Sequence, residues 1–233
     1  MSQQQRTGAD QQRNDAARAE MLRRVRTALH DVPASEQAGP AYAAIPRDYH
    51  QQDTTTRAEI VDLFMERVAD YKATIRKISA GELVDAIATA CEAHGIHRLV
   101  VAADIPSEWL PVGATVLRDE VDGWLSYAQL EQSDGVLTGC ALGIAQTGTI
   151  VLDSGALQGR RVLSLLPDYA LCVIRAEQIV GIVPIAVRHL SEAIEVRHAP
   201  LTLISGPSAT SDIELSRVEG VHGPRTLDVL VVV

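Results

Sequence analysis

The chain of 233 residues is long enough for one large domain, or for one domain with an additional arm. Its hydrophobic content of 46% supports an ordinary buried core. Its formal net charge of −9 and aromatic content of 3% argue against a nucleic-acid-binding protein, which needs basic side chains and stacking surfaces.

The cysteines are Cys91, Cys140 and Cys172, which are widely separated and form no C-x-x-C motif. This spacing predicts neither a zinc site nor an iron–sulphur cluster, so we expect no cofactor held by this chain. The sequence shows no run typical of a signal peptide and no stretch of about 20 apolar residues that could span a bilayer. A cytoplasmic protein with reduced thiols is therefore expected.

Residues 1–50 are expected to form an arm. Residues 1–14 are polar and rich in glutamine, which predicts a disordered tail. From Asp15 a basic amphipathic helix is predicted by apolar residues at helical spacing, namely Leu22, Val25 and Leu29. Residues 31–52 contain several prolines and predict an irregular connector.

The arm is basic, whereas the rest of the chain is acidic. Residues 1–30 contain six arginines and three acidic residues, a balance of +3, which leaves −12 on the remainder. Such an arm could dock on its own acidic body, on a second copy of the chain or on a partner protein, or it could be a solvated helix.

Capped helices and short apolar strands alternate after the connector. A capping box at Thr56–Glu59 predicts a helix to about Ile78, and another at Ser79–Glu82 predicts a helix that ends near Gly95. The apolar run Leu99–Ala103 predicts the first strand. This alternation is typical of an α/β fold with a largely parallel, covered sheet.

The second half of the chain predicts more strands and one interrupted helix. The helix is expected over Ala176–Leu190, with an interruption at Pro184 that could begin a second helix. The strands are expected at Thr115–Leu117, Arg161–Leu166, Ala170–Ile174, Leu201–Ile204 and Asp228–Val233. The glycines do not match G-x-G-x-x-G, so no dinucleotide fingerprint is present.

Gly148 stands between Thr147 and Thr149, where the backbone must approach either a ligand or a neighbouring strand. The spacing favours the neighbouring strand.

The turn after Leu201–Ile204 is the main candidate for a binding site. Ser205, Gly206 and Pro207 end the predicted buried strand, and a group of hydroxyls and one carboxylate follows. This composition suits an anion held on backbone N–H groups at the carboxyl edge of a sheet. Ser211 and Glu214 fit a capping box and are better explained by structure.

His222 lies between two glycines and is either a site residue or a loop histidine that bonds a carbonyl. If the three loops meet at one edge of the sheet, Arg225 would lie near enough to pair with an anionic ligand. The complete set of candidate ligand-binding residues is Thr147, Gly148, Thr149, Ser205, Gly206, Ser208, Thr210, Asp212, His222 and Arg225.

Three motifs together, Ala145–Thr149, Ser205–Glu214 and Gly220–Pro224, resemble the LUD family. The resemblance covers nearly all of the chain from Ile45 onward, so residues 51–233 are expected to form a LUD-like α/β domain. It implies a Rossmann-like sheet of the sugar-isomerase and CoA-transferase type. It also implies organic acid metabolism, namely oxidation of L-lactate to pyruvate with partner proteins that carry the iron–sulphur clusters.

The sequence departs from the family at Gln146, where similar proteins commonly have Glu. In CoA-transferases a Glu can attack as a nucleophile, which an amide cannot do, so Gln146 makes acyl transfer less expected. One function is then an accessory or ligand-binding subunit, with a homo-oligomer as a further possibility. The alternative is a stand-alone enzyme on a phosphorylated or CoA-linked metabolite, with the Ser205–Asp212 loop as phosphate site and His222 as acid or base.

Overall fold

The computed structural model describes residues 3–29, 39–40, 42–121, 123–207, 209–210, 218–219 and 223–233. The chain divides into two compact units, Met1–Tyr49 and His50–Val233.

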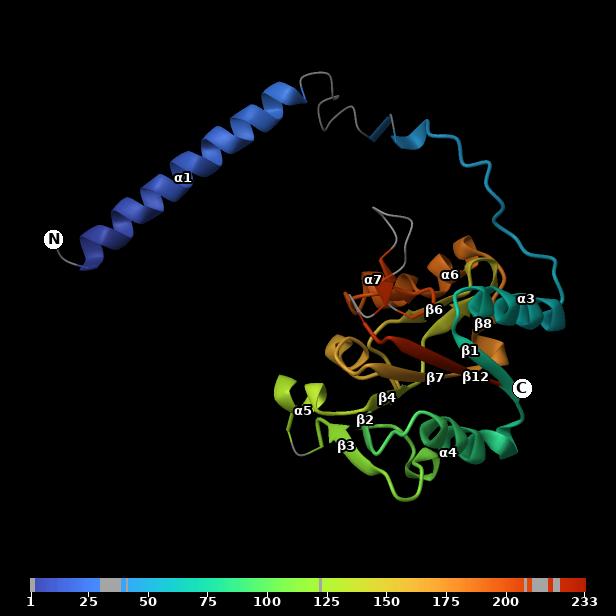
Figure 1. Ribbon diagram of the computed structural model, residues 1–233. Coiled ribbons are helices and arrows are strands. Elements are labelled where there is room, and N and C mark those ends of the chain that lie inside the picture. Colours follow the sequence, from blue (N-terminus) through green and yellow to red (C-terminus); the bar gives the residue numbers. More distant parts are fainter. Residues whose placement is uncertain are drawn as a thin grey trace. The chain divides into compact units, whose positions relative to one another are not determined.

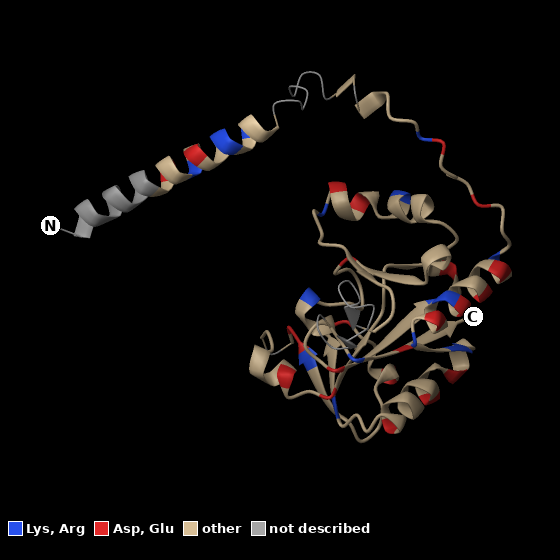
Figure 2. Ribbon diagram, turned by 45° about the horizontal axis from the view of Figure 1, so that its top comes forward, with Lys and Arg blue, Asp and Glu red and all other residues tan. Residues whose placement is uncertain are grey.

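The first unit contains one long helix, α1 (Gln3–Ala28). It begins at Gln3, within the segment for which the sequence predicts a disordered tail. Gln, Arg and Ala have good helix propensity, which allows the helix to extend beyond its apolar stripe. Glu20 pairs with Arg23 and Arg24 at 2.8 Å. Figure 2 shows acidic and basic positions close together along the described part of this helix. In the described part of the chain, no helix is long and apolar enough to cross a membrane.

The second unit is built around a six-stranded sheet in the order β1-β12-β7-β4-β2-β3, in which every neighbouring pair is parallel. Its strands are β1 (Thr74–Ile78), β2 (Arg98–Ala102), β3 (Thr115–Asp119), β4 (Gly135–Thr138), β7 (Tyr169–Arg175) and β12 (Thr226–Val232). The central strand β4 is buried at all four positions, as expected for a sheet that is covered on both faces. The predicted α/β fold with a mainly parallel sheet is confirmed.

A smaller sheet of four strands has the order β8-β5-β6-β9. Its strands are β5 (Leu142–Ile144), β6 (Thr149–Leu152), β8 (Ile179–Val180) and β9 (Thr202–Ile204). A short two-stranded pair, β10 (Ala209–Thr210) and β11 (Val218–Glu219), is antiparallel. The expectation of a buried strand at Leu201–Ile204 is only partly right, because β9 lies at a sheet edge and leaves Leu203 62% exposed.

Helices and sheets of the second unit are stacked in layers, which Figure 1 shows from α4 at the bottom to α6 and α7 at the top. Apolar residues of α4 pack on one face of the large sheet, and α3 with the small sheet packs on the other. The outer face of the small sheet packs against α6 and the following Leu190. The helices are α3 (Arg57–Asp70), α4 (Leu83–Ala93), α5 (Tyr127–Glu131), α6 (Val183–His189) and α7 (Ser191–Glu195).

Both predicted capping boxes are present, at Thr56–Glu59 and at Ser79–Glu82. The first helix nevertheless ends at Asp70 rather than near Ile78, because Lys72 adopts a positive φ of 64° and the chain turns into β1. The partner of β1 is β12, about 150 residues later in the chain, so helical periodicity could not reveal this strand.

Two further expectations were wrong, because Arg161–Leu166 and Ala176–Leu190 form short elements. Arg161–Ser164 is a 3-10 helix, η4, rather than a strand. The expected long helix consists of a 3-10 turn, the strand β8 and then α6, with Pro184 in the first turn of α6 as the prediction allowed.

Two tight turns pack against the last turn of α3. Gly148 has a φ of +58°, and a Cβ at this position would lie 2.7 Å from the carbonyl carbon of Arg67. Gly206 has a φ of +85°, and a Cβ there would overlap the Cβ of Tyr71. The close neighbour of Gly148 is therefore a helix and not the strand that its spacing favoured. These contacts fix both turns relative to one helix end.

We predict that Gly148→Ala lowers the free energy of unfolding by about 1–3 kcal/mol or more, because alanine is strained at positive φ and its Cβ meets the Arg67 backbone. Gly81→Ala is the matched control, since a Cβ at Gly81 has nothing within 4 Å. Urea unfolding measures both variants. Equal midpoints for the two would show that the Gly148 turn is not constrained by α3.

Candidate functional site

A chain of hydroxyl groups links the Gly148 turn to the turn after β9. The Oγ1 atoms of Thr147 and Thr149 lie 2.7 Å apart, and the Oγ1 of Thr149 lies 2.8 Å from the Oγ of Ser205. Thr149 is buried, whereas Ser205 is exposed. The structure thus brings together two of the motifs that the sequence singled out, although 56 residues separate Thr149 from Ser205.

Next to this chain of hydroxyls lies a cavity of about 270 Å³ between the large and small sheets, here called the inter-sheet pocket. The small sheet contributes Ile150, Leu152 and residues 202–204, and the large sheet contributes Thr138, Ala170, Cys172 and Leu227. Ser205, Gly206, Pro207, Gly223 and Pro224 also line the cavity. Its walls are therefore largely apolar, with hydroxyl groups at a few positions.

Of the described residues that line the inter-sheet pocket, Arg161 is the one with a charged side chain. Its Nη1 donates a hydrogen bond to the Oγ of Ser164 at 2.9 Å. Burial lowers the pKa of Arg161 below its usual value, and the described residues offer it no carboxylate partner. A half-buried guanidinium without a counter-charge is costly unless an anion binds to it.

The preceding residue, Arg160, differs from Arg161 because its guanidinium pairs with a carboxylate. Its Nε and Nη2 donate to the two carboxylate oxygens of Asp119 at 2.7 and 2.9 Å, and Asp119 is 1% exposed. The guanidinium carbon also lies 4.9 Å from the ring centroid of Trp124. Arg160 is therefore paired with a buried carboxylate, whereas Arg161 has no such partner within the described ranges.

Sequence reasoning missed Arg161, because it placed this residue at the start of a strand. The pair Arg160-Arg161 gave no sign of which side chain would find a carboxylate, since Asp119 is 41 residues away from Arg160. Ser164 lies one helical turn after Arg161, and this spacing could have suggested a short helix with a polar face.

The predicted site residues fall into three groups. Thr147, Thr149, Ser205 and Gly206 lie together beside or in the wall of the inter-sheet pocket, and Gly148 turns toward α3. Arg225 does not line this pocket, because its Nη1 lies 3.2 Å from the carboxylate of Asp168. Thr210 is in the short strand β10. Three predicted site residues lie outside the described residues, namely Ser208, Asp212 and His222. The predicted capping box Ser211–Glu214 also lies outside them.

Gln146 has a structural contact rather than a place in the pocket wall. Its Oε1 accepts a hydrogen bond from the backbone N–H of Val183 at 3.4 Å, and Val183 is the first residue of α6. The side-chain amide thus satisfies one of the free N–H groups at that helix start.

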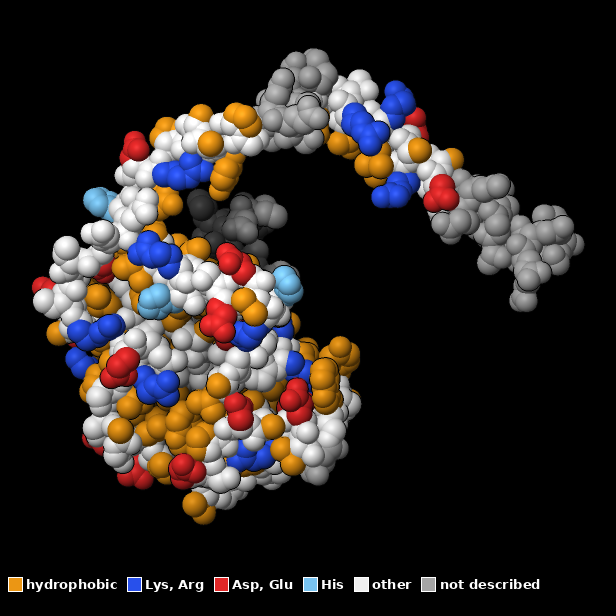
Figure 3. Space-filling model, turned by 180° about the vertical axis from the view of Figure 1, so that it is seen from behind, with side chains coloured by type: hydrophobic (Ala, Val, Ile, Leu, Met, Phe, Trp, Pro, Cys, Tyr) orange, Lys and Arg blue, Asp and Glu red, His pale blue; other side chains and the backbone are white. Residues whose placement is uncertain are grey.

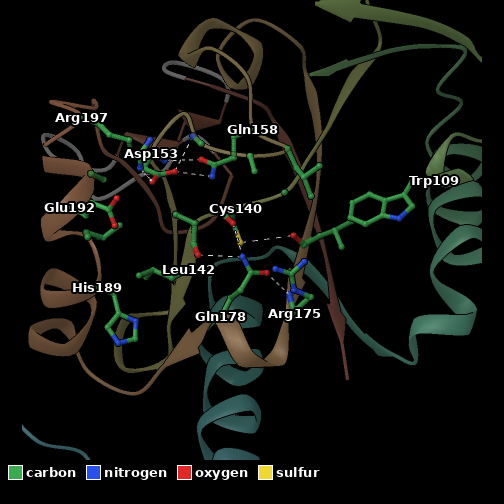
Figure 4. Close-up of a pocket in the computed structure, with 18 residues that line it drawn as sticks. Trp109, Cys140, Leu142, Asp153, Gln158, Arg175, Gln178, His189, Glu192 and Arg197 are labelled. Atoms are coloured by element: carbon green, nitrogen blue, oxygen red, sulfur yellow. Dashed lines mark hydrogen bonds and ion pairs between the residues drawn. The ribbon is translucent and has the colours of Figure 1, made fainter. Parts of the chain in front are cut away.

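A second, larger cavity of about 740 Å³ lies at the carboxyl ends of β4 and β7, and we call it the strand-end pocket (Figure 4). One wall is a polar cluster around Asp153, which accepts hydrogen bonds from Gln158 and the backbone N–H of Gly155 and pairs with Arg197. Elsewhere it is lined by Trp109, Cys140, Arg175, Gln178, His189 and Glu192. In the ranges that the structure describes, no three His, Cys, Asp or Glu side chains are grouped to hold a metal ion.

Asp153 should make stability depend on pH. Burial raises the pKa of its carboxyl, but hydrogen bonds from Gln158, Arg197 and Gly155 outweigh burial and leave the pKa below its usual value. The carboxylate therefore stabilises the fold above the unfolded-state pKa of about 3.9, and this contribution is lost as the pH falls through the lower folded-state pKa.

We predict that the urea midpoint of the wild-type chain falls on acidification below about pH 4, and that Asp153→Asn makes this fall smaller. The exposed Asp62, 3.3 Å from Lys77, provides the control variant Asp62→Asn, which should keep the wild-type profile. An unchanged profile for Asp153→Asn would rule out a stabilising role for the Asp153 carboxylate.

Comparisons with known proteins place this fold and these motifs in a family. A protein of Deinococcus radiodurans named lactate utilization protein C is 48% identical over 216 residues, covering 93% of this chain and 95% of that protein. A protein of the same name from Shouchella clausii is 28% identical over 193 residues, covering 79% and 83%. The crystal structure of a DUF162 family protein from Deinococcus radiodurans superposes with a TM-score of 0.67 at 46% identity, covering 77% of this chain and 99% of that one. The LUD domain model matches residues 58–232, and the chain belongs to the LUD domain family.

Proposed function

We propose that the chain is a ligand-binding subunit of a lactate-utilisation system and that its inter-sheet pocket binds a small organic anion. The observation that carries the proposal is Arg161, a half-buried cation that lines a largely apolar pocket without a carboxylate partner among the described residues. The names of the relatives supply the metabolic context, since two of them are called lactate utilization protein C.

The lining suits a short monocarboxylate. A guanidinium binds a carboxylate through two parallel hydrogen bonds, and the Ser164 hydroxyl beside Arg161 is placed to contact the same group. Apolar side chains such as Ile150 and Leu227 offer a surface for a methyl group. The volume of about 270 Å³ lies at the lower end of ligand pockets, which favours an acid of the size of L-lactate or pyruvate.

The proposal extends to the setting in which this subunit works. We infer a cytoplasmic system in which iron–sulphur partner proteins carry the electrons from lactate, because the cysteines of this chain are too far apart in sequence to form a cluster motif. The all-parallel sheet with its smaller companion sheet supports a Rossmann-like fold of the sugar-isomerase and CoA-transferase type. The proposed subunit could also form a homo-oligomer.

We predict that Arg161→Gln weakens binding of L-lactate or pyruvate about 10- to 100-fold, since hydrogen bonds to a charged group contribute about 1.5–3 kcal/mol. Isothermal titration calorimetry on the full chain measures this effect. Arg225→Gln removes the same charge from an exposed position and should bind like wild type.

Equal affinity of Arg161→Gln and wild type would contradict the proposal. Turnover of a phosphorylated or CoA-linked metabolite by the purified chain alone would instead favour the stand-alone enzyme that the sequence left as the alternative.

A further inference from the structure

The strand-end pocket is too large for a three-carbon acid and has its own recognition groups. Its volume of about 740 Å³ lies well within the range of pockets that hold cofactor-sized molecules. It is formed where β4 and β7 end, at Gly139 and Arg175, and open α/β sheets bind ligands at the carboxyl ends of their strands. Cys140 lines this pocket and Cys172 lines the inter-sheet pocket, so the two cavities share one wall.

Arg175 is the cation of this pocket that remains available to a ligand. It is the last residue of β7, and within the described ranges no carboxylate pairs with its guanidinium, whereas Arg197 pairs with Asp153. Contact with the Cys172 thiol and burial raise the pKa of the Cys140 thiol well above its usual range, and the charge of Arg175 acts in the opposite direction. Arg175 and Cys140 line the same pocket.

Trp109 gives the pocket a planar apolar surface. Its indole is half-buried and lines the pocket at the end of a 3-10 turn, and it is one of two tryptophans in a chain with 3% aromatic residues. Figure 4 shows Trp109 on the same side of the pocket as Arg175, with His189 and Glu192 on the opposite side. The Gln178 amide between them is already occupied, because its Nε2 donates to the carbonyl of Cys140 at 2.7 Å.

We propose that the strand-end pocket binds a nucleoside phosphate, with the phosphate at Arg175 and the base against the Trp109 indole. A guanidinium recognises phosphate oxygens through paired hydrogen bonds, and a flat ring stacks on an aromatic side chain. The Glu192 carboxylate repels the phosphates and can accept hydrogen bonds from ribose hydroxyls, which fixes the direction in which the ligand lies. This inference is independent of the anion proposed for the inter-sheet pocket.

ADP is the probe, titrated calorimetrically into the purified full-length chain. We expect a dissociation constant below about 1 mM, with weaker binding of adenosine and of inorganic pyrophosphate, each of which offers half of the contacts. Arg175→Gln and Trp109→Leu should each weaken ADP binding about tenfold or more. Arg225→Gln and Arg161→Gln should leave it unchanged.

A fluorescence measurement reports the stacking directly. In Trp124→Phe the remaining indole is Trp109, and ADP but not pyrophosphate should quench its emission. Trp124 is 68% exposed, so its replacement should be tolerated.

Three results would overturn the inference. The first is the absence of ADP binding at about 1 mM. The second is ADP binding that is lost in Arg161→Gln but kept in Arg175→Gln. The third is ADP binding without any change in Trp109 emission. The proposed lactate or pyruvate site is tested in the same variants, since Arg175→Gln should keep wild-type affinity for the small acid whatever happens with ADP.

Discussion

The close packing of two turns on the last turn of α3 is the constraint on which the inter-sheet pocket depends. Gly148 approaches the backbone of Arg67 and Gly206 approaches Tyr71, and each adopts a positive φ. Because both turns rest on one helix end, Thr149 and Ser205 meet at hydrogen-bond distance. The small sheet is thereby held against the large one with a cavity between them. Helix α3 therefore determines where the pocket forms, although none of its residues lines the pocket.

The C-terminal strand provides the second constraint, because β12 lies between β1 and β7 rather than at an edge. At the start of this strand the buried Asp228 accepts a hydrogen bond from the Tyr169 hydroxyl at 3.0 Å and lies 3.2 Å from the Nε2 of His94. Burial and the Asp228 charge raise the pKa of Tyr169, so the phenol stays protonated and keeps donating. These contacts connect strand β12 to strand β7 and to the end of α4. Just before β12, Gly223 and Pro224 line the inter-sheet pocket.

The inter-sheet pocket and the strand-end pocket are each lined by one arginine that has no carboxylate partner among the described residues. Arg160 and Arg197 are held by Asp119 and Asp153, whereas Arg161 and Arg175 face pockets. On the face that Figure 3 shows, acidic and basic side chains are interspersed, unlike the continuous basic surface that binds phosphate backbones. Recognition by this protein is therefore proposed to occur inside cavities, and the half-buried Arg161 guanidinium is screened less there than it would be at the surface.

The sequence by itself determined the features that depend on local patterns: the α/β class, the two capping boxes, the first-turn position of Pro184 and the motifs around Gly148 and Ser205. It was silent on β1, whose partner β12 is remote in the chain, and wrong about Arg161–Ser164, which forms a 3-10 helix instead of a strand. It could recognise that Gly148 needs a close neighbour but not that the neighbour is α3. Only the tertiary structure decided which of two adjacent arginines meets Asp119, because the cost of burying a charge depends on groups that the fold brings from elsewhere in the chain.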